Sequence, residues 1–282
     1  MKPAKPFRRI LSLVSIGLMA ASLSQCAWKN TAESFLVSDA DEARLGQQFD
    51  TELRTQPAEY TLYQANTPRK EQFVSYVNGV FEKILANVPA EQKPKYGFRL
   101  AIIDKPVINA FAVPGGYIYM YTGMIDTMRS ESELAGVLAH EIAHVTRHHY
   151  RDALIKVYGI NLLADVLAGS DSSSRLKAFV KQGFTTLASL KVSRSNESDA
   201  DTYGTRYLGL AGWDPYGISD LFSRMPSSGF AWLSTHPAPT NRVKDVKDLV
   251  NSEGTGQNGQ PAWNAGAKKV DEFQAQKANM RN

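Results

Sequence analysis

The stretch Leu138-Ala139-His140-Glu141-Ile142-Ala143-His144 decides how this chain is interpreted. Its two histidines are four positions apart, so on a helix they lie on one face and can bind a single metal ion together. Glu141 follows the first histidine and can take a proton from a water molecule on that metal. The pattern predicts a hydrolytic centre with one zinc ion per chain, in which His140 and His144 are ligands and Glu141 is the catalytic base.

The residues around this motif favour a buried helix. Ser130 and Glu133 have the spacing of a capping box, which satisfies the first backbone N–H groups of a helix. Apolar residues then recur at helical spacing, with small alanines between them; they are Leu134, Val137, Leu138, Ile142 and Val145. The alternative, a surface helix with a coincidental pair of histidines, does not account for this context.

A catalytic zinc site needs a third protein ligand. His148 extends the histidine stripe, but on a continuous helix it lies about 12 Å along the axis from His140, too far to share its metal. The residues that a longer zinc motif would require after His144 are also absent. We therefore interpret His148 and His149 as a solvated or membrane-facing helix end.

A better candidate occurs about fifty residues later, in Glu197-Ser198-Asp199-Ala200-Asp201. Glu197 and Asp201 are four residues apart on a second predicted helix, which Gly212 ends. Glu197 would supply the carboxylate ligand, and Asp201 would accept the N–H of a ligating histidine and orient its ring. The alternative is a solvated acidic helix face, and this is our expectation for Asp199.

These motifs resemble those of the gluzincin zinc peptidases that include the CAAX prenyl proteases, the HtpX-type heat-shock proteases and the mitochondrial Oma-type proteases. The likeness also includes Asn109-Ala110-Phe111-Ala112-Val113-Pro114-Gly115-Gly116, and Thr235-His236-Pro237 followed by Arg242. It extends from about residue 70 to 250, with the four motifs in the order of the family. Within the family it is most similar to the periplasmic outer-membrane lipoproteins of the BepA and LoiP type.

The resemblance implies a mostly helical α+β domain with a small sheet beside the zinc helix. It also implies a role for His236, either as a donor to the tetrahedral oxyanion or as a cap on the zinc. Arg242 would form a salt bridge at the site or act structurally. An edge strand at Phe111, Ala112, Val113 and Pro114 would hold an extended peptide substrate by backbone pairing.

The N-terminal residues resemble a lipoprotein signal. Residues 1–25 combine four basic residues with a short apolar run, which is typical of a secretory signal. Cys26, the only cysteine, follows in Leu23-Ser24-Gln25-Cys26, which resembles a lipobox in which Gln25 replaces the usual small residue. We expect acylation of Cys26 and attachment to the outer membrane from the periplasmic side; the alternative is an idle cysteine.

Composition supports no nucleic-acid partner. The formal charge of the chain is +4, from 32 basic and 28 acidic residues. The signal contributes four of the basic residues, so the mature chain is close to neutral and its basic pI gives no electrostatic case for DNA or RNA. The single cysteine excludes an internal disulfide, so stability must come from a hydrophobic core.

The remaining pattern predicts the organisation of the chain. We expect a signal peptide at 1–25, an anchor linker with a helix at 26–68, the peptidase domain at 69–250 and a flexible tail at 251–282. Within these, helices are expected at 41–54, 74–85, 154–168, 175–190, 197–210 and 215–224, and strands at 97–103 and 110–121.

Two functions are consistent with these features. The first is a zinc endopeptidase that degrades misfolded or stalled proteins of the bacterial envelope. The second is a chaperone-like factor for outer-membrane assembly, with the assembly machinery as its partner, whose protease activity is latent. A prenyl-protein protease is disfavoured because no multiple membrane spans are present. The retention of Glu141 favours the first function.

Overall fold

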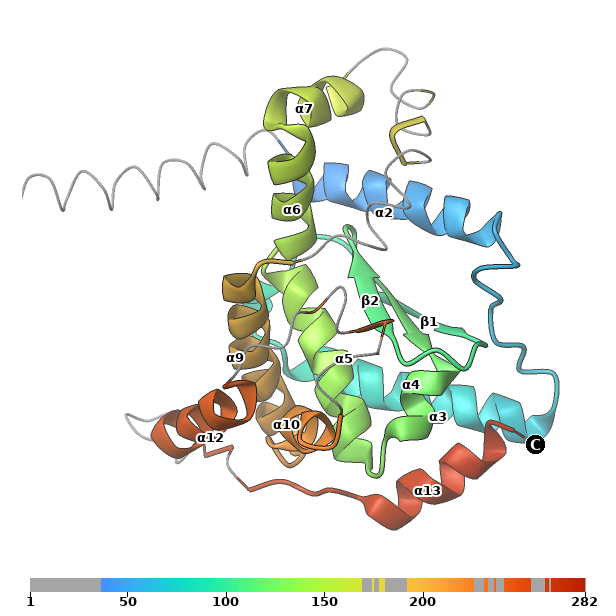
Figure 1. The fold of residues 1–282 in the computed structure, drawn as a ribbon, viewed down its shortest axis with the longest axis vertical. Coiled ribbons are helices and arrows are strands. Elements are labelled where there is room, and N and C mark those ends of the chain that lie inside the picture. Colours follow the sequence, from blue (N-terminus) through green and yellow to red (C-terminus); the bar gives the residue numbers. More distant parts are fainter. Residues whose placement is uncertain are drawn as a thin grey trace, which may run out of the picture.

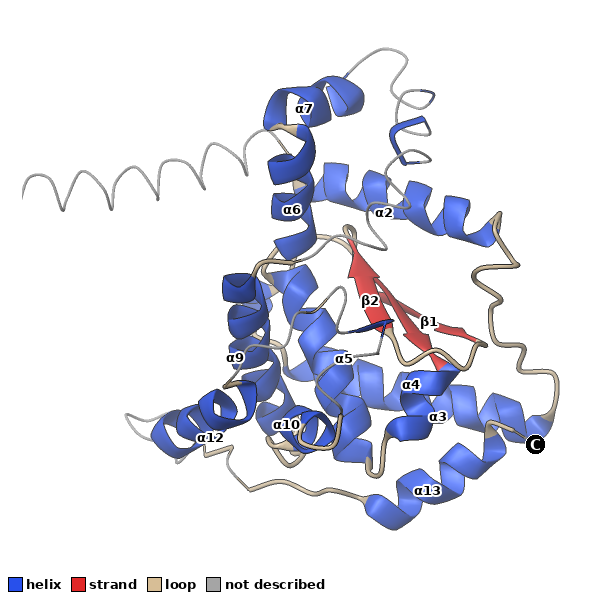
Figure 2. Ribbon diagram, in the orientation of Figure 1, coloured by secondary structure: helices blue, strands red, loops and turns tan. Residues whose placement is uncertain are grey.

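The computed structural model describes residues 37–168, 174, 178–180, 192–225, 231–232, 236, 241–254, 262–263 and 265–281. Over these residues the chain has the predicted mostly helical α+β fold, in which helices surround one small sheet (Figure 1, Figure 2). None of the helices described combines the length and the apolarity that a bilayer crossing requires. Cys26, the signal at 1–25 and most of the helix expected at 175–190 lie outside the described residues.

The elements follow one another in a simple order. They are α2 (Asp39–Arg54), α3 (Pro68–Asn87), the 3-10 helix η1 (Ala90–Gln92), β1 (Arg99–Ile103), β2 (Ala110–Val113), β3 (Tyr117–Tyr121), α4 (Thr122–Thr127), α5 (Glu131–Thr146), α6 (His149–Tyr158), α7 (Ile160–Ala168), α9 (Arg194–Leu210), α10 (Gly217–Phe222), α12 (Arg242–Glu253) and α13 (Val270–Asn279). The predicted helix at 41–54 and both predicted strand regions are thereby confirmed.

The sheet places an edge strand next to the helix with the two histidines. Its strand order is β1-β3-β2, with β1 parallel and β2 antiparallel to the central β3. The β2–β3 turn depends on Gly115 and Gly116, whose φ angles of 81° and 83° favour glycine. At Gly115 a Cβ would also lie 2.6 Å from the carbonyl oxygen of Glu42, so this turn packs tightly against α2.

Helix α5 runs through the interior of the fold. All 16 of its residues are buried, and the side chain of Ser130 caps it as predicted by accepting the N–H of Glu133. Small residues let neighbouring helices pack closely against α5. A Cβ at Gly136, for example, would lie 2.6 Å from the backbone nitrogen of Ile218 in α10. The helix that carries the sequence motif is therefore also the centre of the core.

The chain after α5 differs from the expected single helix at 154–168. His148 adopts a left-handed conformation with φ 56° and ends the α5 direction, and α6 begins at His149. Gly159, with φ 80°, then separates α6 from α7. The two helices extend away from the C-terminal end of α5 (Figure 1). Positive φ at these two positions interrupts a pattern that otherwise has continuous helical periodicity.

The C-terminal region also differs from the expected flexible tail. Helix α12 continues to Glu253, and α13 packs against α3. Phe273 of α13 is fully buried. The polar composition of 251–262 predicted flexibility, but the buried side chains of Phe273 and Met280, together with contacts at the start of α13, are enough to dock a largely polar helix.

One of these contacts leads to a stability prediction. The buried carboxylate of Glu131, at the first turn of α5, accepts bonds from Tyr76 Oη (2.5 Å) and Trp213 Nε1 (2.6 Å) and pairs with Lys269 Nζ (2.9 Å). Glu131→Ala leaves the indole N–H buried without a partner, so we expect it to lower the free energy of unfolding by about 3 kcal/mol. Urea denaturation measures this change.

Glu272→Ala is the matched control, because Glu272 is largely exposed and lies 3.7 Å from the same lysine. We expect it to change the free energy of unfolding by less than about 0.5 kcal/mol. Equal effects of the two substitutions would show that Glu131 does not link α5 to its neighbours.

Candidate metal centre

His140 and His144 meet as the sequence predicts. Their Nε2 atoms lie 3.0 Å apart, and both side chains are fully buried. The rings stand nearly perpendicular, with centroids 4.6 Å apart, so both Nε2 atoms face the same point beside α5. One turn of a well-packed helix therefore presents two imidazole donors to a common centre.

Glu197 comes to this point from α9. Its carboxylate oxygens lie 3.6 Å from His140 Nε2 and 3.4 Å from His144 Nε2, and the side chain is fully buried. Ser193 caps α9 by accepting the N–H of Asn196, which places Glu197 in the first turn. The alternative of a solvated acidic face is wrong for Glu197.

The arrangement fits a metal ion. Among the described residues, neither buried carboxylate oxygen of Glu197 has a hydrogen-bond partner, which is costly for a charged group. Four side chains have a donor atom within 4.8 Å of one another: His140, His144, Glu197 and His236. Donors about 2.1 Å from one tetrahedral ion are separated by about 3.4 Å, close to the distances found here. A divalent cation would compensate the buried charge.

Asp201 and Arg242 hold the ring of His140 in place. Asp201 Oδ1 lies 3.0 Å from His140 Nδ1, on the ring edge opposite the donor atom. Arg242 in turn holds Asp201 with two bonds, from Nε (2.6 Å) and Nη2 (2.5 Å), and its Nη1 lies 3.5 Å from Glu197. The structure thus places Asp201 against the ring that it was expected to orient, and Arg242 forms a salt bridge at the site, one of the two roles expected for it.

The charges of the centre are coupled in the metal-free chain. Burial disfavours a charged His140, but the neighbouring carboxylates of Asp201 and Glu197 outweigh it and raise its pKa to about 9. Burial and the neighbouring His140 hold the pKa of His144 well below its ordinary value. Burial raises the pKa of Asp201, but Arg242 and His140 lower it further, so the net shift is downward. A metal ion must therefore displace the proton of His140 when it binds.

Glu141 and His236 lie beside the donor atoms of His140, His144 and Glu197. Both oxygens of Glu141 are buried and lack a hydrogen-bond partner, and one lies 3.4 Å from His236 Nε2. The ring of His236 stacks on Trp232 with a centroid distance of 4.8 Å and is fully buried. Its centroid is 5.4 Å from that of His140 and 5.3 Å from that of His144. Both predicted residues are thus within reach of a molecule at the centre.

His149 and Asp199 are functional candidates that the sequence interpretation missed. We expected both to be solvated, but His149 is buried and its Nδ1 lies 2.9 Å from His144 Nδ1. Asp199 accepts a bond from Arg147 and lies 3.1 Å from His149 Nε2. The left-handed His148 produces this arrangement, and no local sequence signal predicts a histidine in that conformation.

The residues predicted to bind substrate lie at the sheet edge beside α5. Phe111, Ala112 and Val113 belong to β2, which pairs only with β3 among the described strands, and Pro114 starts the following turn. Packing of β2 against α5 brings this edge close to the histidine helix. The position is suitable for pairing with an extended peptide.

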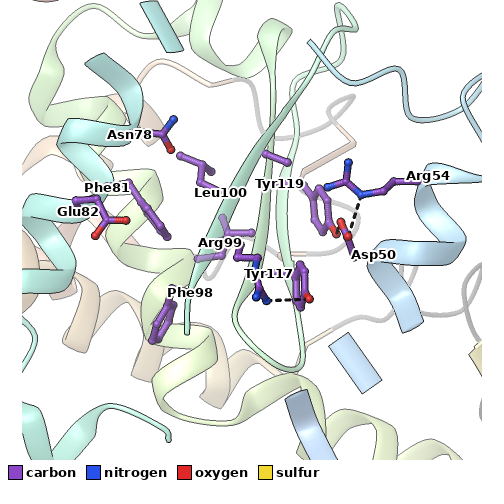
Figure 3. Close-up of a pocket in the computed structure, with 12 residues that line it drawn as sticks. Asp50, Arg54, Asn78, Phe81, Glu82, Phe98, Arg99, Leu100, Tyr117 and Tyr119 are labelled. Atoms are coloured by element: carbon purple, nitrogen blue, oxygen red, sulfur yellow. Dashed lines mark hydrogen bonds and ion pairs between the residues drawn. The ribbon is translucent and has the colours of Figure 1, made fainter. Parts of the chain in front are cut away.

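A separate hollow lies on the sheet between α2 and α3. It has a volume of about 310 Å³ and contains none of the predicted site residues. Figure 3 shows that Arg54 pairs with Asp50 in this hollow and that Arg99 donates to Tyr117 Oη. Tyr119 also donates to Asp50. The hollow therefore has no convergent reactive groups, in contrast to the buried donor cluster.

Close packing of α9 on α5 gives a testable prediction. A Cβ at Gly204 would lie 3.0 Å from both the Cα and the nitrogen of His140. We expect Gly204→Ala to push α9 away, because the backbone of α5 cannot yield, and to separate Glu197 and Asp201 from the histidines. Zinc affinity should fall about 10-fold and the free energy of unfolding by about 1–3 kcal/mol.

Gly79→Ala is the control, since an added Cβ at Gly79 in α3 meets nothing within 4 Å. It should leave zinc affinity unchanged and stabilise the helix slightly. Isothermal titration and urea denaturation of both variants check the prediction. Unchanged zinc affinity in Gly204→Ala would mean that the α5–α9 distance does not control the site.

Comparisons with known proteins agree with this geometry. The family model described as peptidase family M48 matches residues 72–250. The chain is 31% identical over 195 residues to a beta-barrel assembly-enhancing protease of Yersinia pestis, an alignment that covers 62% of this chain and 38% of the relative. It is 30% identical over 182 residues to the mitochondrial metalloendopeptidase OMA1 of Schizosaccharomyces pombe, which covers 62% and 52%. The chain thus spans about half or less of the length of these relatives.

Proposed function

The chain belongs to peptidase family M48, and on this premise we propose that it is a zinc endopeptidase of the bacterial envelope. Its substrates would be misfolded or stalled periplasmic and outer-membrane proteins. The observation that carries the proposal is the buried cluster of His140, His144 and Glu197, with Glu141 beside it. Two imidazoles and one carboxylate are a donor set that suits a catalytic zinc ion.

The roles of the residues follow from their positions. Zinc held by His140, His144 and Glu197 would supply a Lewis acid that polarises the scissile carbonyl and acidifies water. Glu141, whose carboxylate has no hydrogen-bond partner among the described residues, takes the proton of the attacking water and returns it to the leaving amine. Asp201 and Arg242 keep the ring of His140 oriented.

The edge strand would position the substrate. An extended peptide that adds to β2 is held through its backbone, so Phe111, Ala112, Val113 and Pro114 would select weakly among side chains. This mode is appropriate for an enzyme that acts on many unfolded proteins. It requires opening of the centre, because His140, Glu141, His144, Glu197 and His236 are all fully buried.

Two features support an envelope location. The relatives from Yersinia pestis and Escherichia coli are named beta-barrel assembly-enhancing proteases, and β-barrels are the typical fold of proteins that span bacterial outer membranes. The N-terminal pattern that ends at Cys26 is suited to lipid attachment at the outer membrane. A Cys26→Ser chain that still partitions with outer membranes would contradict the anchor.

The test is zinc-dependent cleavage of casein by the full chain in mild detergent. We expect one zinc ion per chain, loss of cleavage after chelation, and recovery when zinc is returned but not when magnesium is added. His236→Ala separates the two roles of that residue: cleavage rises if His236 caps the zinc and falls if it donates to the oxyanion. Bound zinc without cleavage in either form would favour the assembly factor instead.

A further inference from the structure

The two metal-facing histidines are supported in different ways. His140 donates directly to Asp201, which Arg242 holds. In the described part of the chain no carboxylate lies at Nδ1 of His144; instead this atom lies 2.9 Å from Nδ1 of His149. We propose that His149 and Asp199 are positioning residues of the metal centre, which fix the ring of His144 with its Nε2 in the donor cluster. This inference rests on the proposed metallopeptidase function.

The hydrogen-bond pattern allows one consistent assignment of protons. A histidine that binds a metal through Nε2 carries its remaining proton on Nδ1. Nδ1 of His144 must then donate, so Nδ1 of His149 must accept, and the proton of His149 is on Nε2. That atom lies 3.1 Å from Asp199 Oδ2, which can accept it. Each ring is thereby fixed in tautomer and in orientation.

The surroundings hold this pair in place. His149 is 5% exposed, and its ring meets that of His144 at 74° with centroids 5.0 Å apart. Asp199 also accepts a 2.7 Å bond from Nε of Arg147, whose guanidinium lies 4.2 Å from the ring centre of Tyr203. Both histidines of the motif are thus backed by an aspartate of α9 that an arginine holds, and His144 reaches its aspartate through His149.

Helix geometry explains why an intermediate residue is needed. Glu197 and Asp201 are one turn apart on α9 and face the centre together. Asp199, two residues from each, is rotated by about 200° from Glu197 and points away from that face. The left-handed turn at His148 places His149 between this carboxylate and His144.

The test is the zinc affinity of the full chain, measured by competition with a chromophoric chelator. We expect His149→Phe, which keeps the ring volume but removes the acceptor, to weaken zinc binding about 10–100-fold. His149→Asn should recover most of this loss, because its Oδ1 occupies the place of Nδ1 and can accept from His144. The visible spectrum of the cobalt-loaded protein should change in His149→Phe and return in His149→Asn.

Two controls separate orientation from packing. His148→Asn is the neighbouring substitution; His148 bonds to Glu42 rather than to the centre, and asparagine tolerates its left-handed backbone. Its zinc affinity should equal that of the unmodified chain. If His149→Phe does not fold, Asp199→Ala is tested in its place. Its control is Ser198→Ala, at an exposed neighbouring position on α9. Asp199→Ala should bind zinc more weakly than this control.

The inference is overturned if His149→Phe binds zinc as tightly as the unmodified chain, or if His149→Phe and His149→Asn lose the same amount of zinc affinity. It is also overturned if the unmodified chain binds no zinc. The proposed protease activity fails separately: zinc affinity that follows the expected order without any casein cleavage would support the positioning role and exclude the enzyme.

Discussion

Glu141→Gln is expected to lower kcat for casein cleavage about 10³-fold while the chain keeps its zinc. The amide cannot accept the proton of the attacking water, and a positioned general base contributes about 10²–10⁴-fold to such a reaction. Zinc content should remain at one ion per chain, because Glu141 is not among the four residues whose donor atoms converge. Metal analysis and a fluorescent casein assay on the same preparation measure both quantities.

Glu91→Gln is the control for this substitution. Glu91 is an exposed glutamate of η1, so the same chemical change there should leave kcat unaltered. Cleavage that persists in zinc-loaded Glu141→Gln would remove Glu141 from the mechanism. Loss of zinc together with cleavage would instead make it a residue of the metal site.

Glu197→Gln is expected to weaken zinc binding at least 100-fold, more than the loss of a residue that only supports a ligand. The amide preserves the shape of the side chain but removes the negative charge that the cation would neutralise. At a zinc concentration 100 times the dissociation constant of the unmodified chain, zinc should stabilise that chain by about 2.7 kcal/mol and the variant by only about 0.4 kcal/mol.

The stability of the metal-free chain provides an independent test of the role of Glu197. Burial raises the pKa of Glu197, but His236, His140 and His144 lower it by more, to well below its ordinary value. A lowered pKa means that the charged carboxylate stabilises the fold at neutral pH, so Glu197→Gln should also lower the free energy of unfolding of the metal-free chain. Urea denaturation with and without zinc separates this loss from the loss of zinc stabilisation. Equal zinc stabilisation of the variant and the unmodified chain would show that Glu197 is not a ligand.

Much of the fold was predictable because it depends on local patterns. The cap at Ser130, the apolar spacing of α5 and the Pro114-Gly115-Gly116 turn all appear in the structure where the sequence predicts them. The structure differs from two predictions, a single helix at 154–168 and a flexible tail at 251–282. The first difference depends on positive φ at His148 and Gly159, and the second on the burial of Phe273 and Met280.

The residues of the candidate site also differ in how far the sequence predicted them. His140, Glu141 and His144 belong to one helical turn, so their spacing alone places them together. Glu197 and Asp201 were identified as candidates from their spacing and from the family resemblance, but solvated and ligating roles looked similar at that level. His149 and Asp199 were taken for surface residues, because histidines and aspartates that end or face away from a helix usually are.

The amino-acid sequence by itself determined the chemistry at the core of this protein: two imidazoles and a base on one helix, since helical periodicity is a property of neighbouring residues. Only the tertiary structure decided which other groups complete the site. The contact of Gly204 with His140 brings α9 against α5, and the left-handed His148 turns His149 back onto His144. Such encounters depend on packing between residues distant in sequence and on rare backbone conformations, and neither has a local signature.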